Sequence, residues 1–339
     1  MTKVHEEILK VIQQIDFSGT VIVQNDEEII QAFSTSFANR SYEALNTLET
    51  IFAIASGCKL FTAIAICQLV EQSELMFETK LSDILPNTFP LFDEEITIHH
   101  LLTHTSGMPD YFDEDEMDDF EELWISRPMY SMRKAKDFLP LFQHLPMKGN
   151  VGEAFHYNNA GYIVLGLIVE EVSGDAFDEY VQKNIFDRCH MNDSGYYVLD
   201  TLPKNCATGY IDFEDGSWKT NSYAVPIKGG ADGGAFTSAG DWLKLWNSLL
   251  QYELLSEETT KKLLTPYINT DDDFDRFYGY GVWIDVLDEE ITKYHVMGYD
   301  PGVSFHSAYY PEKNAISTVC SNKSEGAYDI FKVIDVHLL

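Results

Sequence analysis

The hydrophobic positions in the first part of the chain change their spacing twice. Over residues 4–15 they recur at helical spacing within a polar segment, which predicts an amphipathic helix. Residues 20–33 then form two short apolar runs around a turn at Asn25-Asp26, which predicts a pair of strands. Residues 52–70 are apolar at nearly every position and rich in Ala, Leu and Ile, so we expect a buried helix there.

Strand-like patterns return near the C-terminus. Runs rich in aromatic and β-branched residues cover 278–286, 293–297, 303–310 and 315–320, and residues 324–339 have the pattern of a closing helix. Between about 80 and 200, helix-like patches alternate with loops. This arrangement predicts an α/β (α+β) fold with one antiparallel sheet built from both chain ends, flanked by helices, and a mainly helical insertion. We place the discontinuous sheet-plus-helix domain at 1–85 and 205–339, and the insertion at 86–204.

Charge narrows the classes of partner. The chain has 339 residues, 45% of them hydrophobic, with 23 Lys plus Arg against 55 Asp plus Glu and a formal net charge of −32. Such a surface repels phosphate backbones and anionic membranes, so we expect no nucleic acid and no membrane partner. The acidic run at 113–122 predicts an exposed loop, and a lid beside a pocket is the alternative.

The N-terminal residues and the cysteines indicate a cellular compartment. Charges interrupt every apolar stretch near the N-terminus, so we expect no signal peptide, and no stretch is long enough for a membrane span. The five cysteines are scattered and form no C-x-x-C pair, which argues against a disulfide framework or a zinc knuckle. We therefore expect a cytoplasmic protein, unless a leader has been removed.

The first candidate for chemistry is Ser56-Gly57-Cys58-Lys59. Ser56 and Lys59 are almost one helical turn apart, so they project from the same face. A serine hydroxyl needs a neighbouring base to act as a nucleophile, and a desolvated lysine amine can serve. The alternative is a capping serine followed by an exposed lysine. Apolar neighbours on nearly every side of Lys59 argue against that alternative, because a buried lysine needs a partner.

Two further segments carry suitable groups. In Tyr157-Asn158-Asn159 a phenol can relay a proton and an amide can hold a substrate carbonyl, although Tyr and Asn are also common in turns. Residues 296–304 combine a strand end with Gly and Pro turn signals, and their backbone N–H groups could stabilise an oxyanion.

The order of these segments resembles that of the serine β-lactamase and penicillin-binding protein superfamily, in its class C and esterase-like branch. The resemblance extends to 101–109, 152–162 and 233–242, and it covers the chain from about residue 18 to the end. It implies one β-lactamase-like unit in all. It also implies that Ser56 forms an acyl-enzyme, and that Lys59 takes the proton of Ser56 or lowers the pKa of Tyr157.

By the same resemblance, Tyr157 acts as general base and acid, and Asn159 holds Lys59 and the substrate amide. Gly298 and Tyr299 lie on the third strand, where the N–H groups of Ser56 and Tyr299 would form the oxyanion hole. The family usually has Lys-Thr-Gly or His-Thr-Gly there, whereas this chain has Val296-Met297-Gly298. The groups that would bind a substrate carboxylate are therefore missing, and His295 should point to the other face of the strand.

Other sites are weaker alternatives. His99, His100 and His104 could suggest a metal, but no acidic ligand pattern accompanies them. Asp271, Asp273 and Asp275 mimic the start of a calcium loop, which then lacks the required Gly and Glu. Cys58 lies beside Ser56, and we assign it to helix packing. We expect no metal and no cofactor.

Three functions remain open at this point. The first is a serine hydrolase that acts through an acyl-enzyme on a small ester or amide. The second is a penicillin-binding protein or D-amino-acid-specific, carboxypeptidase-like peptidase. The third is a non-catalytic ligand-binding descendant. We expect residues 110–150 and 205–232 to form the loops that determine specificity.

Overall fold

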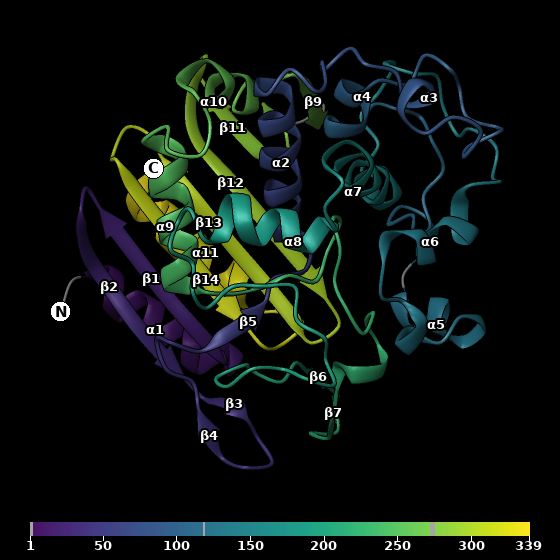
Figure 1. Cartoon of the computed structure of the whole chain (residues 1–339). Coiled ribbons are helices and arrows are strands. Elements are labelled where there is room, and N and C mark those ends of the chain that lie inside the picture. The colour runs from purple at the N-terminus through teal and green to yellow at the C-terminus, as the bar shows by residue number, and fades with distance from the viewer. Residues whose placement is uncertain (1–2, 118, 272–274) are drawn as a thin grey trace.

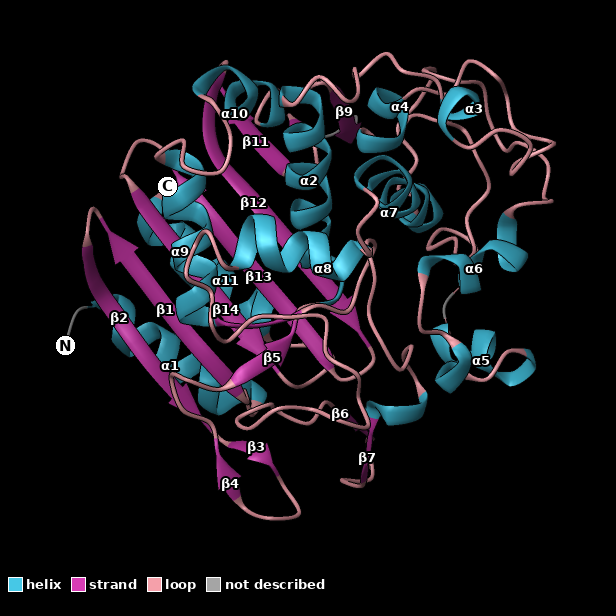
Figure 2. Cartoon of the chain, in the orientation of Figure 1, coloured by secondary structure: helices cyan, strands magenta, loops and turns pink. Residues whose placement is uncertain are grey.

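A computed structural model describes residues 3–117, 119–271 and 275–339. Its centre is an eight-stranded sheet in the order β2-β1-β14-β13-β12-β11-β10-β9, in which every neighbouring pair is antiparallel (Figures 1 and 2). These strands are β1 (Gly19–Asn25), β2 (Glu28–Thr35), β9 (Ile268–Asp271), β10 (Arg276–Tyr278), β11 (Trp283–Leu287), β12 (Glu290–Asp300), β13 (Val303–Tyr310) and β14 (Ala315–Ser321).

The two ends of the chain meet inside this sheet. Strand β1 pairs with β14 over its whole length, from Gly19 opposite Ser321 to Asn25 opposite Ala315. The predicted sheet built from both chain ends is therefore confirmed, and its last two strands coincide with the predicted runs at 303–310 and 315–320.

Short strands and turns lie at the margins of this sheet and before the helices. They are β3 (Phe37–Asn39), β4 (Ala44–Leu45), β5 (Ile51–Ala53), β6 (Tyr210–Asp212), β7 (Trp218–Thr220) and β8 (Phe236–Ser238). The short 3-10 and π turns are η1 (Ala55–Cys58), η2 (Phe120–Glu122), η3 (Met129–Ser131), η4 (Gln182–Phe186) and η5 (Asn221–Tyr223).

The helices divide between the two faces of the sheet and the chain between β5 and β6 (Figure 1), which includes the insertion that we predict at 86–204. They are α1 (Lys3–Ile15), α2 (Lys59–Glu71), α3 (Leu81–Ile84), α4 (Ile98–Leu102), α5 (Leu123–Ser126), α6 (Ala135–Phe142), α7 (Asn159–Ser173), α8 (Phe177–Val181), α9 (Ala239–Leu250), α10 (Glu257–Leu263) and α11 (Ala327–Leu338).

Successive residues of β1 show how the faces differ. Val21 and Val23 pack with α1 and α11, whereas Ile22 joins the large core that contains α2, α7 and α9. This period of two is what a strand buried on both faces requires. The predicted helix over residues 4–15 is confirmed as α1.

The structure corrects the helix predicted for 52–70. Residues 51–53 form β5, which pairs with β8, and η1 separates β5 from α2, which begins only at Lys59. Ala55 has a positive φ of 44°, which ends the strand direction. Burial on all sides removes the period that distinguishes a strand from a helix, so the pattern alone could not locate this boundary.

The single strand predicted for 278–286 is also wrong, because it is divided into β10 and β11. The turn between them contains Gly281, with a φ of +70°. A side chain there would approach the Lys59 carbonyl oxygen to 2.8 Å and the Ala63 Cβ to 2.9 Å, so the turn packs directly on the start of α2. Within the described ranges, no helix is both long and apolar enough to cross a membrane.

Candidate active site

Ser56 and Lys59 lie at the join between η1 and α2. Ser56 is in the 3-10 turn, one step before the α-helix, and its side chain lines a pocket. The first hydrogen bond of this turn runs from the Gly57 N–H to the Ile54 carbonyl oxygen. The N–H of Ser56 comes before it and has no acceptor within the turn, as is usual for the first N–H groups of a helix. Lys59 is only 1% exposed.

The Lys59 ammonium is held by three acceptors. Its Nζ donates to Ser56 Oγ at 2.9 Å, to Asn159 Oδ1 at 2.8 Å and to the Asp232 backbone carbonyl at 2.7 Å. Three donors and three acceptors satisfy the group completely, which explains how a lysine can be buried here. The structure thus brings together residues separated by more than a hundred positions in the chain.

Tyr157 completes this cluster from the segment before α7. Lys59 Nζ lies 4.8 Å from the centre of the Tyr157 ring, and that ring stacks on Trp283 at 6.0 Å. Burial, followed by the Glu114 charge, raises the pKa of Tyr157 well above its usual value, although a Ser56 hydrogen bond acts in the opposite direction. Tyr157 is therefore a neutral phenol in the resting protein.

Gly298 brings the third strand against the serine. A Cβ on Gly298 would lie 2.0 Å from the Ile54 carbonyl oxygen and 2.9 Å from Ser56 N, so only glycine fits. Pairing of β12 with β11 ends at His295, which leaves the following edge of β12 without that partner. Strand β12 therefore runs directly past the N–H of Ser56.

Tyr299 and His295 lie on the face of β12 opposite to Gly298, as the alternation predicts. Tyr299 bonds through its hydroxyl to His306 Nε2 at 2.7 Å, and His295 Nε2 lies 3.3 Å from Asp285 Oδ1. Val296 is buried in the core. No cationic side chain stands at these third-strand positions.

A pocket of about 700 Å³ opens in front of Ser56. Its wall includes residues from both loops expected to determine specificity, among them Glu114 and Phe138 from the first and Asn221 and Lys228 from the second. Glu114 also bonds through Oε1 to Asn159 Nδ2 at 3.2 Å. From the acidic run, Glu114, Asp119 and Glu121 thus line the pocket, and Glu114 and Asp119 are exposed.

Several residues that the sequence did not single out support this cluster. The Asp110 carboxylate accepts the N–H groups of Tyr111, Asn159 and Ala160, which fixes the start of α7. Burial raises the pKa of Asp110 to about 7, against these three donors. The sequence could have indicated Asp110 only by its position, directly after Met108-Pro109 of the segment that resembles the family.

His104, which the sequence indicated only as a possible metal ligand, also supports this cluster. Its Nδ1 accepts the Asn158 N–H at 3.0 Å, its carbonyl accepts the His156 N–H at 2.9 Å, and its ring lies 4.5 Å from that of Tyr157. An Nδ1 acceptor requires the Nε2–H tautomer. Burial, with the Lys59 charge, holds the pKa of His104 well below its usual range, so the ring is neutral.

The histidines do not form a metal site together. His99 Nδ1 bonds to the Tyr280 hydroxyl and His100 Nδ1 to Thr97, while His104 faces the tyrosines. The proposed calcium loop includes Asp273, which lies outside the described residues. Cys58 is buried, its thiol faces the Gly230 carbonyl, and burial raises its pKa to about 12.

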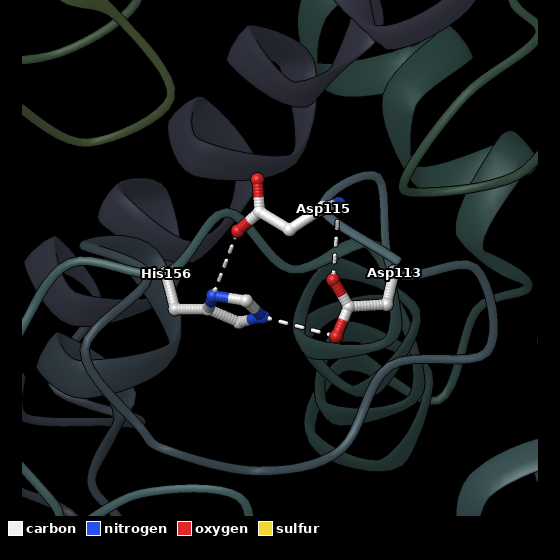
Figure 3. A group of neighbouring side chains, drawn as sticks. All are labelled: Asp113, Asp115 and His156. Atoms are coloured by element: carbon white, nitrogen blue, oxygen red, sulfur yellow. Dashed lines mark hydrogen bonds and ion pairs between the residues drawn. The ribbon is translucent and has the colours of Figure 1, made fainter. Parts of the chain in front are cut away.

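Another group of possible ligands consists of Asp113, Asp115 and His156 (Figure 3). His156 bridges the two carboxylates, at 3.2 Å from Asp113 and 3.4 Å from Asp115. The Lys148 ammonium already contacts Asp113 at 2.5 Å. Lys148 contacts Glu116 as well, at 2.8 Å, so we interpret the group as an ion-pair network that joins the loop beside the pocket to residues 148 and 156.

Comparison with known proteins agrees with this architecture. Residues 10–335 match the family model Beta-lactamase. The crystal structure of a penicillin binding protein from Bacillus halodurans is 57% identical, with a TM-score of 0.93 over 97% of this chain and 99% of that one. Penicillin-binding protein 4* of Bacillus subtilis is 27% identical over 91% of this chain, which spans 69% of that relative.

A more distant structure shares the fold alone. The D-amino acid amidase from Ochrobactrum anthropi SV3, complexed with D-phenylalanine, is 18% identical, with a TM-score of 0.82 over 99% of both chains. The family match spans nearly the whole chain and includes every segment that forms the site. The chain therefore belongs to the β-lactamase family, as the order of its Ser-x-x-Lys, Tyr-x-Asn and glycine-bearing strand segments led us to expect.

Proposed function

We propose that the protein is a serine hydrolase that cleaves a small ester or amide through an acyl-enzyme on Ser56. The observation that carries this proposal is the 2.9 Å contact between Lys59 Nζ and Ser56 Oγ at the base of a pocket. Such a pair supplies a nucleophile and the base that activates it. The hydrolase relatives of the family support the same reaction class.

In this mechanism, the amine form of Lys59 takes the Ser56 proton while Oγ bonds to the substrate carbonyl carbon, and this proton returns Lys59 to the ammonium form that donates to three acceptors in the structure. The N–H groups of Ser56 and Tyr299 stabilise the oxyanion that forms. Tyr157 holds its proton at rest, so it donates that proton to the departing oxygen or nitrogen. Water then attacks the acyl-enzyme: one water proton passes to Tyr157, and the proton held by Lys59 returns to Ser56 Oγ as the acid leaves, so that all three side chains are restored. Asn159 keeps Lys59 in place and binds the substrate amide.

A second candidate is a penicillin-binding protein or D-amino-acid-specific peptidase. The 57% identity to a penicillin binding protein favours it. The absence of a cation or hydroxyl at Val296-Met297 counts against it, because a penicillin or a peptide C-terminus presents a carboxylate there.

Intact mass measurement tests both candidates. The protein is treated in parallel with a fluorophosphonate, a penicillin and a nitrophenyl ester, and the modified residue is located by peptide mapping. We expect the fluorophosphonate to phosphonylate Ser56 and the ester to acylate it. In Ser56→Ala both adducts should be absent, and turnover should fall by at least about 1,000-fold. A stable penicillin adduct on Ser56 would favour the second candidate.

Cys58→Ala is the matched control, because Cys58 is the nearest other nucleophile and is buried with a protonated thiol. It should retain both adduct and turnover. Full activity in Ser56→Ala would refute the proposal, because another group would then carry the reaction. Neither adduct nor turnover in the wild-type protein would favour the non-catalytic ligand-binding alternative.

A further inference from the structure

The part of β12 that passes Ser56 has a neighbouring strand on one edge only. Its pairing with β11 ends at His295, whereas its pairing with β13 continues to Asp300. On the other edge, Gly298 lies against the backbone of η1. A segment with fewer hydrogen-bonded neighbours opens and shifts more readily than the middle of a sheet. Contacts that fix residues 296–300 therefore also fix their position relative to Ser56.

The hairpin that follows β12 determines where the Tyr299 N–H points. Asp300 and Val303 are the pair that closes the two-residue turn Pro301-Gly302. In an antiparallel ladder the closing pair of such a hairpin is hydrogen-bonded, and the next pair, Tyr299 with Ser304, is not. The Tyr299 N–H therefore points away from β13, toward the edge that faces η1.

The Tyr299 side chain joins β12 to β13 on the opposite face from Gly298. Tyr299 stands opposite Ser304, and His306 is two residues further along β13, so Tyr299 and His306 are diagonal neighbours on one face. The Tyr299 hydroxyl lies 2.7 Å from His306 Nε2, and the two ring centres are 5.7 Å apart. The contact thus connects the two strands at the residue that carries the oxyanion donor.

His306 is a firmly placed partner. Its side chain is buried, and its ring lies 4.7 Å from that of Phe331 and 5.4 Å from that of Tyr328, both in α11. Burial, followed by His295, holds the pKa of His306 well below its usual range, and burial raises the pKa of Tyr299 above its usual value. Both groups are therefore neutral near neutral pH, so the bond between them does not depend on an ionised state.

Tyr299 is the one side-chain hydrogen-bond partner of His306 among the residues that the structure describes. His306 Nδ1 is buried without a partner there. Tyr299 is 42% exposed, so its hydroxyl could bond to water instead. Breaking the contact would cost the tyrosine little but would leave the imidazole with no partner at all. A leucine would fill this layer without an unpaired nitrogen, so packing alone does not explain the histidine.

A second contact anchors the other end of the same segment. His295, the last β12 residue paired with β11, has its Nε2 3.3 Å from Asp285 Oδ1. Asp285 in turn contacts Arg276 at 2.8 Å and Lys293 at 3.3 Å. Residues 296–298 are thus bounded by a side-chain contact to β11 before them and by one to β13 after them. Only the second contact lies at the oxyanion donor itself.

We propose that His306 is a positioning residue of the hydrolase: by holding the Tyr299 hydroxyl, it fixes the end of β12 so that the Tyr299 N–H meets the oxyanion. His306 touches neither the substrate nor Ser56 and acts through Tyr299. The inference rests on the proposed function, since the position of this N–H matters only if an oxyanion forms at Ser56.

The test removes each half of the contact in the full-length protein. In Tyr299→Phe, which keeps the ring and the backbone, and in His306→Leu, we expect kcat for a nitrophenyl ester to fall by about 10-fold. KM should stay within about twofold, because an interaction made in the transition state is weakened rather than substrate binding. His306→Gln, whose amide can still meet the hydroxyl, should restore kcat to within about threefold of wild type.

The double variant decides whether the two residues act as a unit. Tyr299→Phe combined with His306→Leu should lose no more than the larger single loss, since each change breaks the same contact. Losses that multiply to about 100-fold would overturn the positioning role. Wild-type kcat in both single variants would overturn it as well.

Tyr310→Phe is the matched control. Tyr310 lies on the same face of β13 as His306, and its buried hydroxyl bonds to Asp335 of α11 at 2.6 Å. Removing that hydroxyl should lower the melting temperature but keep kcat within about twofold. A loss of kcat as large as in Tyr299→Phe would show that any loosening of this layer lowers turnover, which would overturn the specific role of His306.

Labelling of Ser56 by the fluorophosphonate separates failure of this inference from failure of the proposed function. The phosphonyl oxygen takes the place of the oxyanion, so the labelling rate should also fall by about 10-fold in Tyr299→Phe and not in Tyr310→Phe. Equal rates in wild type and Tyr299→Phe overturn the positioning role while Ser56 remains the nucleophile. No labelling of the wild-type protein refutes the proposed function itself.

Discussion

At the scale of single residues, the geometry of the site depends on a glycine, Gly298, which has no side chain. Gly298 allows β12 to lie against η1, with Ile54, Ser56 and Gly57 all within 3 Å of where a Cβ would stand. These neighbours are backbone atoms, which cannot rotate away. A methyl group would therefore displace either the strand or the turn that carries Ser56.

We predict that Gly298→Ala lowers kcat by about 100-fold or more, because a displacement near 1 Å at a reacting group has that effect. Its melting temperature should also fall. Gly240→Ala is the control: its Cβ would meet only Ser238 Oγ at 4.0 Å, and alanine favours the α9 helix that contains it. Wild-type kcat in Gly298→Ala would show that the strand is not positioned as we describe.

The sequence indicated some of these residues and not others, for a physical reason. Ser56, Lys59, Tyr157 and Asn159 carry reactive groups in short motifs, and the structure brings the four together. Asp232 has no such motif. Its carbonyl reaches Lys59 across 173 positions, a contact that only the folded chain defines. Its carboxylate likewise meets Tyr111 across 121 positions.

At the scale of elements, the start of α7 determines where Asn159 lies. Two side chains fix it: Asn158 caps Gly161 N–H at 2.7 Å, and Asp110 accepts the N–H groups of Asn159 and Ala160. These are helix-start N–H groups that have no acceptor within the helix. Asp110, in the loop before α5, is thereby joined to α7, whose Asn159 accepts a hydrogen bond from Lys59.

We predict that Asp110→Asn destabilises the protein by about 2 kcal/mol, because an amide nitrogen would replace one acceptor oxygen and leave a buried N–H unpaired. Turnover should fall as well, since Asn159 would lose its fixed position. Asp215→Asn is the matched control, because Asp215 also accepts a backbone N–H, from Ser217, but in an exposed turn. Its effect on unfolding in urea should stay within about 0.5 kcal/mol.

Elements with a clear period were predictable, and those without one were not. The short apolar run at β1, the aromatic and β-branched runs at β13 and β14, and the helical spacing of α1 match the structure closely. The error at 52–70 arose because β5, η1 and α2 are buried on all sides, so hydrophobicity could not separate them. The division of β10 from β11 depends on contact between Gly281 and α2, which lies far away in the sequence.

At the scale of the whole molecule, acidic residues greatly outnumber basic ones, so only some of the carboxylates have a basic partner. The net charge is −32, and many exposed carboxylates have ion-pair partners, such as Glu257 with Lys261 and Glu258 with Lys262. Pairs of this kind contribute little to stability. Self-repulsion at the surface and the buried carboxylates of the pocket therefore act together on the pH dependence of folding.

The pocket carboxylates determine the sign of that dependence. The pKa values of Asp110 and Asp300 are raised from 3.8 to about 7, and that of Asp232 is also raised, chiefly by burial. At pH values between 3.8 and about 7, the native state holds protons that the unfolded chain has released. The free energy of unfolding therefore falls as the pH rises. Asp285 acts in the opposite sense: burial raises its pKa, but His295 and Arg276 lower it overall, so its contribution is lost only in acid.

We therefore predict that the melting temperature is highest near about pH 5 and falls by several degrees toward pH 8, because one pKa unit corresponds to about 1.4 kcal/mol. Thermal unfolding followed by circular dichroism at constant ionic strength measures it. Added salt should reduce only the part of the fall that surface repulsion causes, since buried carboxylates are screened little. Asp300→Asn should flatten the slope between pH 5 and 8, and the exposed Asp288→Asn should not. A melting temperature that stays constant or rises over this range would contradict the assignment of raised pKa values to the pocket, because carboxyl groups with raised native pKa values lower the free energy of unfolding as the pH rises.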